Sequence, residues 1–131
     1  MNHIKKQILV VDDETSIHKM LNFLLSADYN IVVKQDGAEA ISWLEAGNNP
    51  DLIISDLEMP YVDGESFIRN LKGSKLYCDT PVILLSGTEN LENIVERMPY
   101  RPDYFFKKPF TPSDLRAAIT AALLHYDLLN G

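Results

Sequence analysis

The fold is decided by Ile8-Leu9-Val10-Val11-Asp12-Asp13, in which four consecutive apolar residues are followed at once by two carboxylates. A short apolar run without alternation is typical of a strand that is buried on both faces, as in a parallel sheet covered by helices on each side. Two adjacent aspartates do not belong in such a core. The stretch therefore predicts a buried strand that ends at a polar edge.

The same alternation of short apolar runs and helical patterns continues to the end of the chain. It predicts one doubly wound, flavodoxin-like α/β domain over residues 1–131, with a five-stranded parallel sheet in the order 2-1-3-4-5, five helices and no output domain. The further strands are expected at residues 31–33, 52–54 running into Asp56, 82–85 and 104–106. The helices are expected over 17–25, from 37 to about 47, around 67–71, over 91–98 and from Pro112 onward.

The charge is unevenly distributed along the 131 residues. The formal net charge is −7, and all of it falls in residues 1–64, which hold 4 basic and 11 acidic side chains, whereas residues 65–131 hold 8 of each. Such a balance repels phosphate backbones, so we expect no direct binding to nucleic acid. It favours a site for a cation.

The sequence lacks the features of an exported or membrane protein. Cys78 is the only cysteine, so no internal disulfide can form and a reduced cytosol is favoured. The longest apolar runs cover four residues, far from the roughly 20 that a bilayer requires. The first residues contain no signal-peptide pattern. We therefore expect a soluble, cytoplasmic protein with no membrane partner.

Four of the five expected strands end in polar side chains. Ligands of open α/β sheets bind outside the carboxyl ends of the strands, so these side chains should meet at one edge. In the order 2-1-3-4-5 the first and third strands are neighbours, which brings three aspartates into one cluster. The polar residues are Asp12 and Asp13, Asp56, Ser86, and Lys107 and Lys108.

Three clustered carboxylates need a compensating positive charge. At an effective dielectric constant of 20, two like charges about 4 Å apart repel by roughly 4 kcal/mol. A few hard oxygen ligands with room for water suit Mg²⁺, and Lys108 supplies a second positive charge. This arrangement suits a phosphoryl acceptor, in which an aspartate is the nucleophile and Ser86 donates a hydrogen bond to a phosphoryl oxygen.

Together these motifs resemble the receiver domain of two-component response regulators over essentially the whole chain. Each motif alone is common as a helix cap or a solvated charge, and their joint occurrence in this order is what is specific. The motifs are Asp12-Asp13, Asp56-Leu57-Glu58-Met59-Pro60 with Asp63-Gly64, Ser86-Gly87 and Lys108-Pro109-Phe110. The resemblance implies that Asp56 is the phosphoacceptor and that Ser86 and Lys108 hold the phosphoryl group. It also implies Asp13 as a direct Mg²⁺ ligand assisted by Asp12, and the main-chain carbonyl of Glu58 as a further ligand.

The resemblance also implies partners and a switch in a phosphorelay. The phosphoryl donor is a phosphohistidine on a sensor histidine kinase or a phosphotransfer protein. Phosphorylation changes the binding of a downstream protein, a fused effector domain or a second copy of the chain on the face of the fourth helix, fifth strand and fifth helix. The family couples Ser86 to an aromatic residue, here Phe105, where tyrosine is commoner. Glu58 and Thr88 occupy positions at which the family tunes the lifetime of the phosphate.

Two other classes of function are weighed against this one. Phosphohydrolases with an aspartate nucleophile carry, by resemblance, an Asp and a Thr where this chain has Glu58 and Pro60. An interaction module independent of phosphorylation has no physical use for clustered charges at a buried edge. We therefore expect a signalling protein that catalyses only its own phosphotransfer and autodephosphorylation and is otherwise not an enzyme. Asn130-Gly131 reads like the start of a linker, which slightly favours a piece of a longer protein over a stand-alone regulator.

Overall fold

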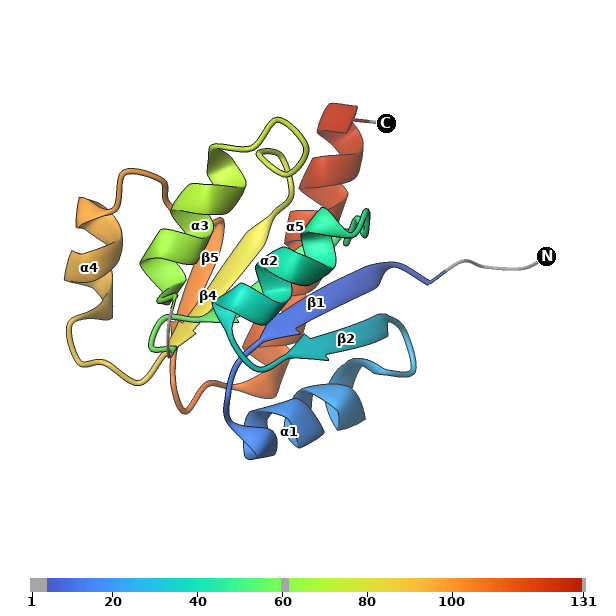
Figure 1. The fold of residues 1–131 in the computed structure, drawn as a ribbon. Helices are drawn as coiled ribbons and strands as arrows, with labels where there is room; N and C mark the ends of the chain where they lie inside the picture. The colour runs from blue at the N-terminus through green and yellow to red at the C-terminus, as the bar shows by residue number, and fades with distance from the viewer. Residues whose placement is uncertain (1–4, 60–61, 131) are drawn as a thin grey trace.

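The computed structural model describes residues 5–59 and 62–130 and contains a five-stranded parallel sheet between two layers of helices (Figure 1). The order across the sheet is β2-β1-β3-β4-β5, and each neighbouring pair is parallel, which confirms the predicted doubly wound order. Pro60, Tyr61, Gly131 and the first four residues lie outside the described part. The strands are β1 (Gln7–Val11), β2 (Asn30–Lys34), β3 (Leu52–Asp56), β4 (Val82–Ser86) and β5 (Tyr104–Lys107).

The apolar runs of the sequence form the middle of the sheet. All residues of β3 and β4 are buried, as are the last four residues of β1. Successive side chains of a strand point to opposite faces. Ile8 and Val10 accordingly lie in one apolar core, and Leu9 and Val11 lie in the other. Because both faces are covered, these strands carry unbroken apolar runs, and the buried polar residues Ser55, Asp56 and Ser86 come at their carboxyl ends.

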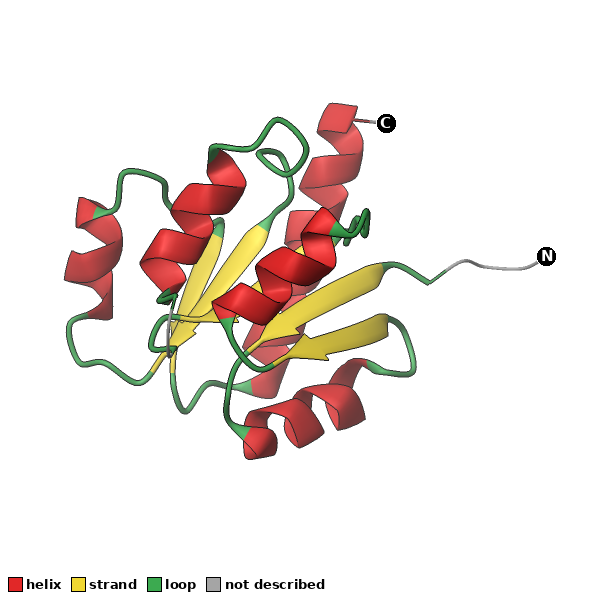
Figure 2. Ribbon diagram, in the orientation of Figure 1, coloured by secondary structure: helices red, strands yellow, loops and turns green. Residues whose placement is uncertain are grey.

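The five helices divide between the two faces of the sheet (Figure 2). Residues of α1 and α5 pack into one core, and residues of α2, α3 and α4 pack into the other. No helix in the described part of the chain is long and apolar enough to cross a bilayer. The helices are α1 (Thr15–Leu25), α2 (Gly37–Glu45), α3 (Gly64–Lys72), α4 (Leu91–Arg97) and α5 (Pro112–Asn130).

The strand β5 departs from the prediction that every apolar run is buried on both faces. Tyr104 and Phe105 are 38% and 36% exposed, and Phe106 is half-buried. The strand lies at the edge of the sheet and pairs only with β4. An edge strand is flanked on one side alone, so helices that seal the middle strands leave its side chains partly open to solvent. Phe105 is therefore a surface residue in this structure.

The register of the sheet brings the polar strand ends to one edge. Val11 of β1 lies opposite Ser55, and Asp56 of β3 lies opposite Leu85. Ser86 of β4 in turn lies opposite Lys107. The strands end within about one residue of each other, so the side chains that follow them share the same space.

A glycine allows α3 to begin directly against the chain that leaves β3. A Cβ on Gly64 would lie 2.5 Å from the main-chain oxygen of Asp56 and 2.6 Å from Cα of Leu57. The Gly64 N–H also donates a hydrogen bond to the Leu57 carbonyl at 2.8 Å. Since both obstacles are backbone atoms, a larger residue cannot be accommodated by moving a side chain.

We expect Gly64→Ala to lower the free energy of unfolding by about 1–3 kcal/mol, the usual cost of forcing atoms into a packed site. Urea denaturation followed by circular dichroism measures this change. Gly87→Ala is the matched control, because a Cβ there meets nothing within 4 Å. Its effect should stay within about 0.5 kcal/mol. Equal midpoints for the two variants would contradict the close approach at Gly64.

Candidate functional site

Three carboxylates gather at the carboxyl edge of the sheet. Asp12 follows β1 and is 1% exposed, Asp56 ends β3 and is 3% exposed, and Asp13 is open to solvent. One carboxylate oxygen from each lies within 4.8 Å of the other two. The structure thus brings together the three aspartates that the strand order placed side by side.

Lys108 provides the positive charge of this cluster. Its Nζ lies 2.9 Å from Glu14 Oε1, 3.2 Å from Asp12 Oδ2 and 3.4 Å from Asp56 Oδ1. Burial by itself would lower the pKa of Lys108, but the hydrogen bond to Glu14 and the charges of Asp56 and Asp12 raise that pKa above its ordinary value. The side chain therefore remains an ammonium group at neutral pH.

Asp56 is buried among other negative charges. Burial, followed by the negative charges of Asp12 and Glu58, raises the pKa of its carboxyl group to about 7, although Lys108 acts in the opposite direction. Its Oδ1 is buried and accepts no hydrogen bond from the described residues, in spite of the nearby Lys108 ammonium. A buried polar atom without a partner is costly, so this oxygen is suited to an additional ligand.

The donor set fits a hard divalent cation. Asp12 Oδ1 accepts a hydrogen bond from the Glu14 N–H at 2.9 Å, which fixes the orientation of that carboxylate. Asp13 adds an oxygen on the solvent side, where water can complete a coordination shell. Carboxylate oxygens together with water are the ligands that Mg²⁺ prefers. The unpartnered Asp56 oxygen and the surrounding negative charge are consistent with a metal at this position.

Ser86 lies beside this cluster at the end of β4 and is completely buried. Its hydroxyl donates a hydrogen bond to Glu58 Oε1 at 2.5 Å and accepts one from the Thr88 N–H at 3.0 Å. The Lys108 N–H donates to the Ser86 carbonyl at 2.7 Å, which ties the loops after β4 and β5 together. The hydroxyl is thus next to the site but is engaged with Glu58.

Phe105 lies apart from the charged cluster. It is on β5 and forms part of the wall of a cavity of about 250 Å³ together with Leu91, Glu92 and Lys107. Lys107 pairs with Glu89 at 2.9 Å on the same surface. The aromatic ring is thus on the outer edge of the sheet, beside the beginning of α4.

The chain matches the family model of the response regulator receiver domain over residues 8–120. The chain belongs to this family. Its five-stranded order and its five helices are those of the family's fold.

Relatives of this receiver domain include transcriptional regulators. The probable transcriptional regulator ycf27 of Porphyridium aerugineum is 33% identical over 124 residues, which cover 94% of this chain and 50% of the relative. The alkaline phosphatase synthesis transcriptional regulatory protein PhoP of Bacillus subtilis is 33% identical over 121 residues, or 92% of this chain and 49% of the relative. The receiver domain thus spans about half the length of these curated relatives.

Solved receiver domains have the same architecture. A response regulator receiver domain protein from Clostridium thermocellum superposes with a TM-score of 0.83 at 31% identity, covering 95% of this chain and 98% of the other. The chemotaxis response regulator CheY4 of Vibrio cholerae superposes with a TM-score of 0.79 at 26% identity, covering 91% and 99%.

Sequence reasoning missed three contacts of the receiver domain site. Glu14 binds Lys108. The Glu58 side chain binds Ser86, whereas the resemblance implies that Glu58 contributes its main-chain carbonyl to Mg²⁺. His18, one turn into α1, contacts the main-chain oxygen of Asp12 through Nε2. Glu14 follows the aspartate pair directly, so its position in the sequence was a usable signal. The side-chain contact of Glu58 and the position of His18 had no comparable signal.

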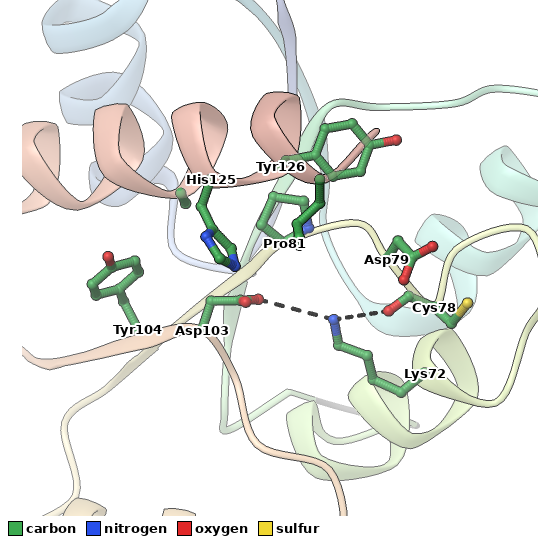
Figure 3. Close-up of a pocket in the computed structure, with 10 residues that line it drawn as sticks. Lys72, Cys78, Asp79, Pro81, Asp103, Tyr104, His125 and Tyr126 are labelled. Atoms are coloured by element: carbon green, nitrogen blue, oxygen red, sulfur yellow. Dashed lines mark hydrogen bonds and ion pairs between the residues drawn. The ribbon is translucent and has the colours of Figure 1, made fainter. Parts of the chain in front are cut away.

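A second cavity, of about 420 Å³, lies at the opposite end of the sheet (Figure 3). It borders the residues that precede β4 and β5, Pro81 and Asp103. Lys72 in its wall donates to the carbonyls of Cys78 and Thr80 at 3.3 and 3.0 Å and lies 3.9 Å from the Asp103 carboxylate. This lysine ties the α3–β4 connection to the start of β5 and takes no part in the acidic cluster.

The raised pKa of Asp56 predicts a pH-dependent stability in metal-free buffer. Between the ordinary value of 3.8 and about 7, the native chain keeps a proton that the unfolded chain has lost. The free energy of unfolding should therefore fall as pH rises through this window, by at most about 1.4 kcal/mol per pH unit, and should level off above it.

Asp56→Asn is the matched variant because it cannot ionise. We expect its advantage in free energy of unfolding over the wild type to grow from about pH 4 to about pH 7 and then to remain constant. Urea denaturation at a series of pH values measures the difference. A difference that is independent of pH would contradict the raised pKa.

Proposed function

We propose that this receiver domain is a phosphorylation-dependent switch in which Asp56 takes a phosphoryl group from a phosphohistidine. The observation that carries the proposal is a buried carboxylate with an unpartnered oxygen, 3.4 Å from a lysine ammonium and adjacent to two further carboxylates. An Asp56 oxygen forms a bond to phosphorus while the bond from phosphorus to the donor's imidazole nitrogen breaks. The imidazole leaves with the electron pair and takes up a proton from solvent.

The residues around Asp56 divide the work of stabilising this transfer. Lys108 places its ammonium beside the position where negative charge accumulates on the phosphoryl oxygens. Asp12, Asp13, Asp56 and the main-chain carbonyl of Glu58 would hold Mg²⁺, which when bound offsets the clustered charge and favours the ionised, nucleophilic form of Asp56. Ser86 would donate its hydroxyl hydrogen to a phosphoryl oxygen.

The relatives indicate the kind of partner that we propose for this domain. These relatives are transcriptional regulators of about twice this length, so we propose that phosphorylation of this domain controls an effector domain or a downstream protein. The exposed Phe105 lies on the face of α4, β5 and α5 that we propose changes its binding, a second copy of the chain being one candidate partner. A sensor histidine kinase or phosphotransfer protein is the proposed donor.

We also propose that the chain has no enzymatic activity toward external substrates beyond its own phosphotransfer and autodephosphorylation. Glu58 occupies the position at which a phosphohydrolase of this chemistry would carry a second aspartate, and its carboxylate is engaged with Ser86. Such a carboxylate is poorly placed to protonate a leaving group.

Incubation with acetyl phosphate and Mg²⁺ tests the proposal. We expect the intact mass to increase by one phosphoryl group, and we expect the increase to disappear when Mg²⁺ is removed with EDTA. Asp56→Asn should abolish the addition, whereas Asp79→Asn, an exposed aspartate in the wall of the second cavity, should leave it unchanged. Labelling that persists in Asp56→Asn would reject Asp56 as the acceptor.

A further inference from the structure

The hydroxyl of Ser86 has its single proton committed elsewhere. It donates to Glu58 Oε1 at 2.5 Å and accepts from the Thr88 N–H at 3.0 Å, and Ser86 is completely buried. A hydroxyl has one hydrogen to donate. Ser86 therefore cannot bind a phosphoryl oxygen as a donor while the contact with Glu58 persists.

The contact with Glu58 joins the ends of two neighbouring strands. Glu58 is an exposed residue in the chain that leaves β3, and its carboxylate reaches Ser86 at the end of the neighbouring strand β4. A short hydrogen bond from a hydroxyl to an ionised carboxylate is among the stronger hydrogen bonds of proteins. The bond thus stabilises one position of the Ser86 hydroxyl in the unphosphorylated chain.

We propose that Glu58 is a latch that holds the Ser86 hydroxyl away from the phosphoryl site until a phosphoryl group arrives. The proposal rests on the proposed function and adds to it a competition between two acceptors for one proton. The Glu58 carboxylate and the phosphoryl oxygens are both negative, so they repel each other across Ser86. Release of Glu58 and capture of the phosphoryl group by Ser86 are then one exchange of hydrogen bonds, in which Glu58 returns to solvent.

Two substitutions of Glu58 separate the effect of its hydrogen bond with Ser86 from the effect of its negative charge. Glu58→Gln removes the negative charge but keeps an oxygen that can accept the Ser86 hydrogen bond. Glu58→Ala removes both the charge and the acceptor. The difference between these two variants therefore isolates the hydrogen bond, and both change an exposed side chain while leaving the main-chain carbonyl in place.

The experiment measures the affinity of the full chain for beryllofluoride, a stable mimic of the phosphoryl group, in the presence of Mg²⁺ by calorimetric titration. The neutral amide oxygen in Glu58→Gln can still accept the Ser86 hydrogen bond, whereas Glu58→Ala leaves the buried Ser86 hydroxyl without this partner in the free state. Glu58→Ala should therefore bind about tenfold more tightly than Glu58→Gln. The amide resonance of Thr88 reports on Ser86 directly, because this amide donates to the Ser86 hydroxyl. We expect it to shift in Glu58→Ala and to stay near the wild-type position in Glu58→Gln.

The same pair of substitutions in a Ser86→Ala background is the control. Without the Ser86 hydroxyl, residue 58 has no hydrogen bond to accept from residue 86, so the two double variants should bind beryllofluoride with equal affinity. Equal affinities of Glu58→Ala and Glu58→Gln in the presence of Ser86 would overturn the latch and leave the proposed function intact. Failure of the wild type to bind beryllofluoride at all would overturn the proposed function, and the latch with it.

Discussion

The structure depends on keeping several negative charges together at the end of one sheet. Asp12, Asp56 and Glu14 surround the ammonium of Lys108, which is the positive group within 3.4 Å of all three carboxylates. The parallel order of β1, β3 and β5 forces this gathering, since the strands all end at the same edge. Lys108 balances part of the charge. Burial, together with the remaining negative charge, raises the pKa of the Asp56 carboxyl group, and the buried Oδ1 of Asp56 accepts no hydrogen bond from the described residues. Both properties suit a site that binds a cation.

Lys108 and Ser86 differ in how far their side chains must rearrange before they can bind a phosphoryl group. The Lys108 ammonium already lies beside Asp56, so the Lys108 side chain needs little rearrangement. The Ser86 hydroxyl donates to Glu58, so it must exchange this partner before it can donate to a phosphoryl oxygen. The exchange that we propose gives the Ser86 hydroxyl two discrete hydrogen-bonded arrangements, one with Glu58 and one with a phosphoryl oxygen. Such bistability is what a switch requires, because a ligand shifts an equilibrium only if it binds the two states differently.

The scaffold explains why the site and its outer surface differ in character. The middle strands are covered by helices on both faces and end in the buried residues Asp56 and Ser86. The edge strand β5 is open, and it carries both Lys108 at its end and Phe105 on its exposed flank. One short strand thus connects the charged site to the solvent-facing surface beside α4. Phe106 of the same strand packs against one of the two apolar cores, so a displacement of β5 would reach the site, the outer surface and that core.

The sequence alone determined the order of elements, the doubly wound sheet and the grouping of three aspartates with Lys108. These follow from apolar periodicity and from strand order, which are set by local burial and by the topology of parallel strands. It did not determine that Phe105 is exposed, since an apolar run does not reveal which strand lies at the edge. Only the tertiary structure decided that Glu14 binds Lys108 and that Glu58 binds Ser86, contacts between residues 94 and 28 positions apart. Both contacts depend on where long, flexible side chains lie after the backbone has folded. The position of Glu14 directly after the aspartate pair is a partial signal, but no spacing in the sequence marks Glu58 as the partner of Ser86.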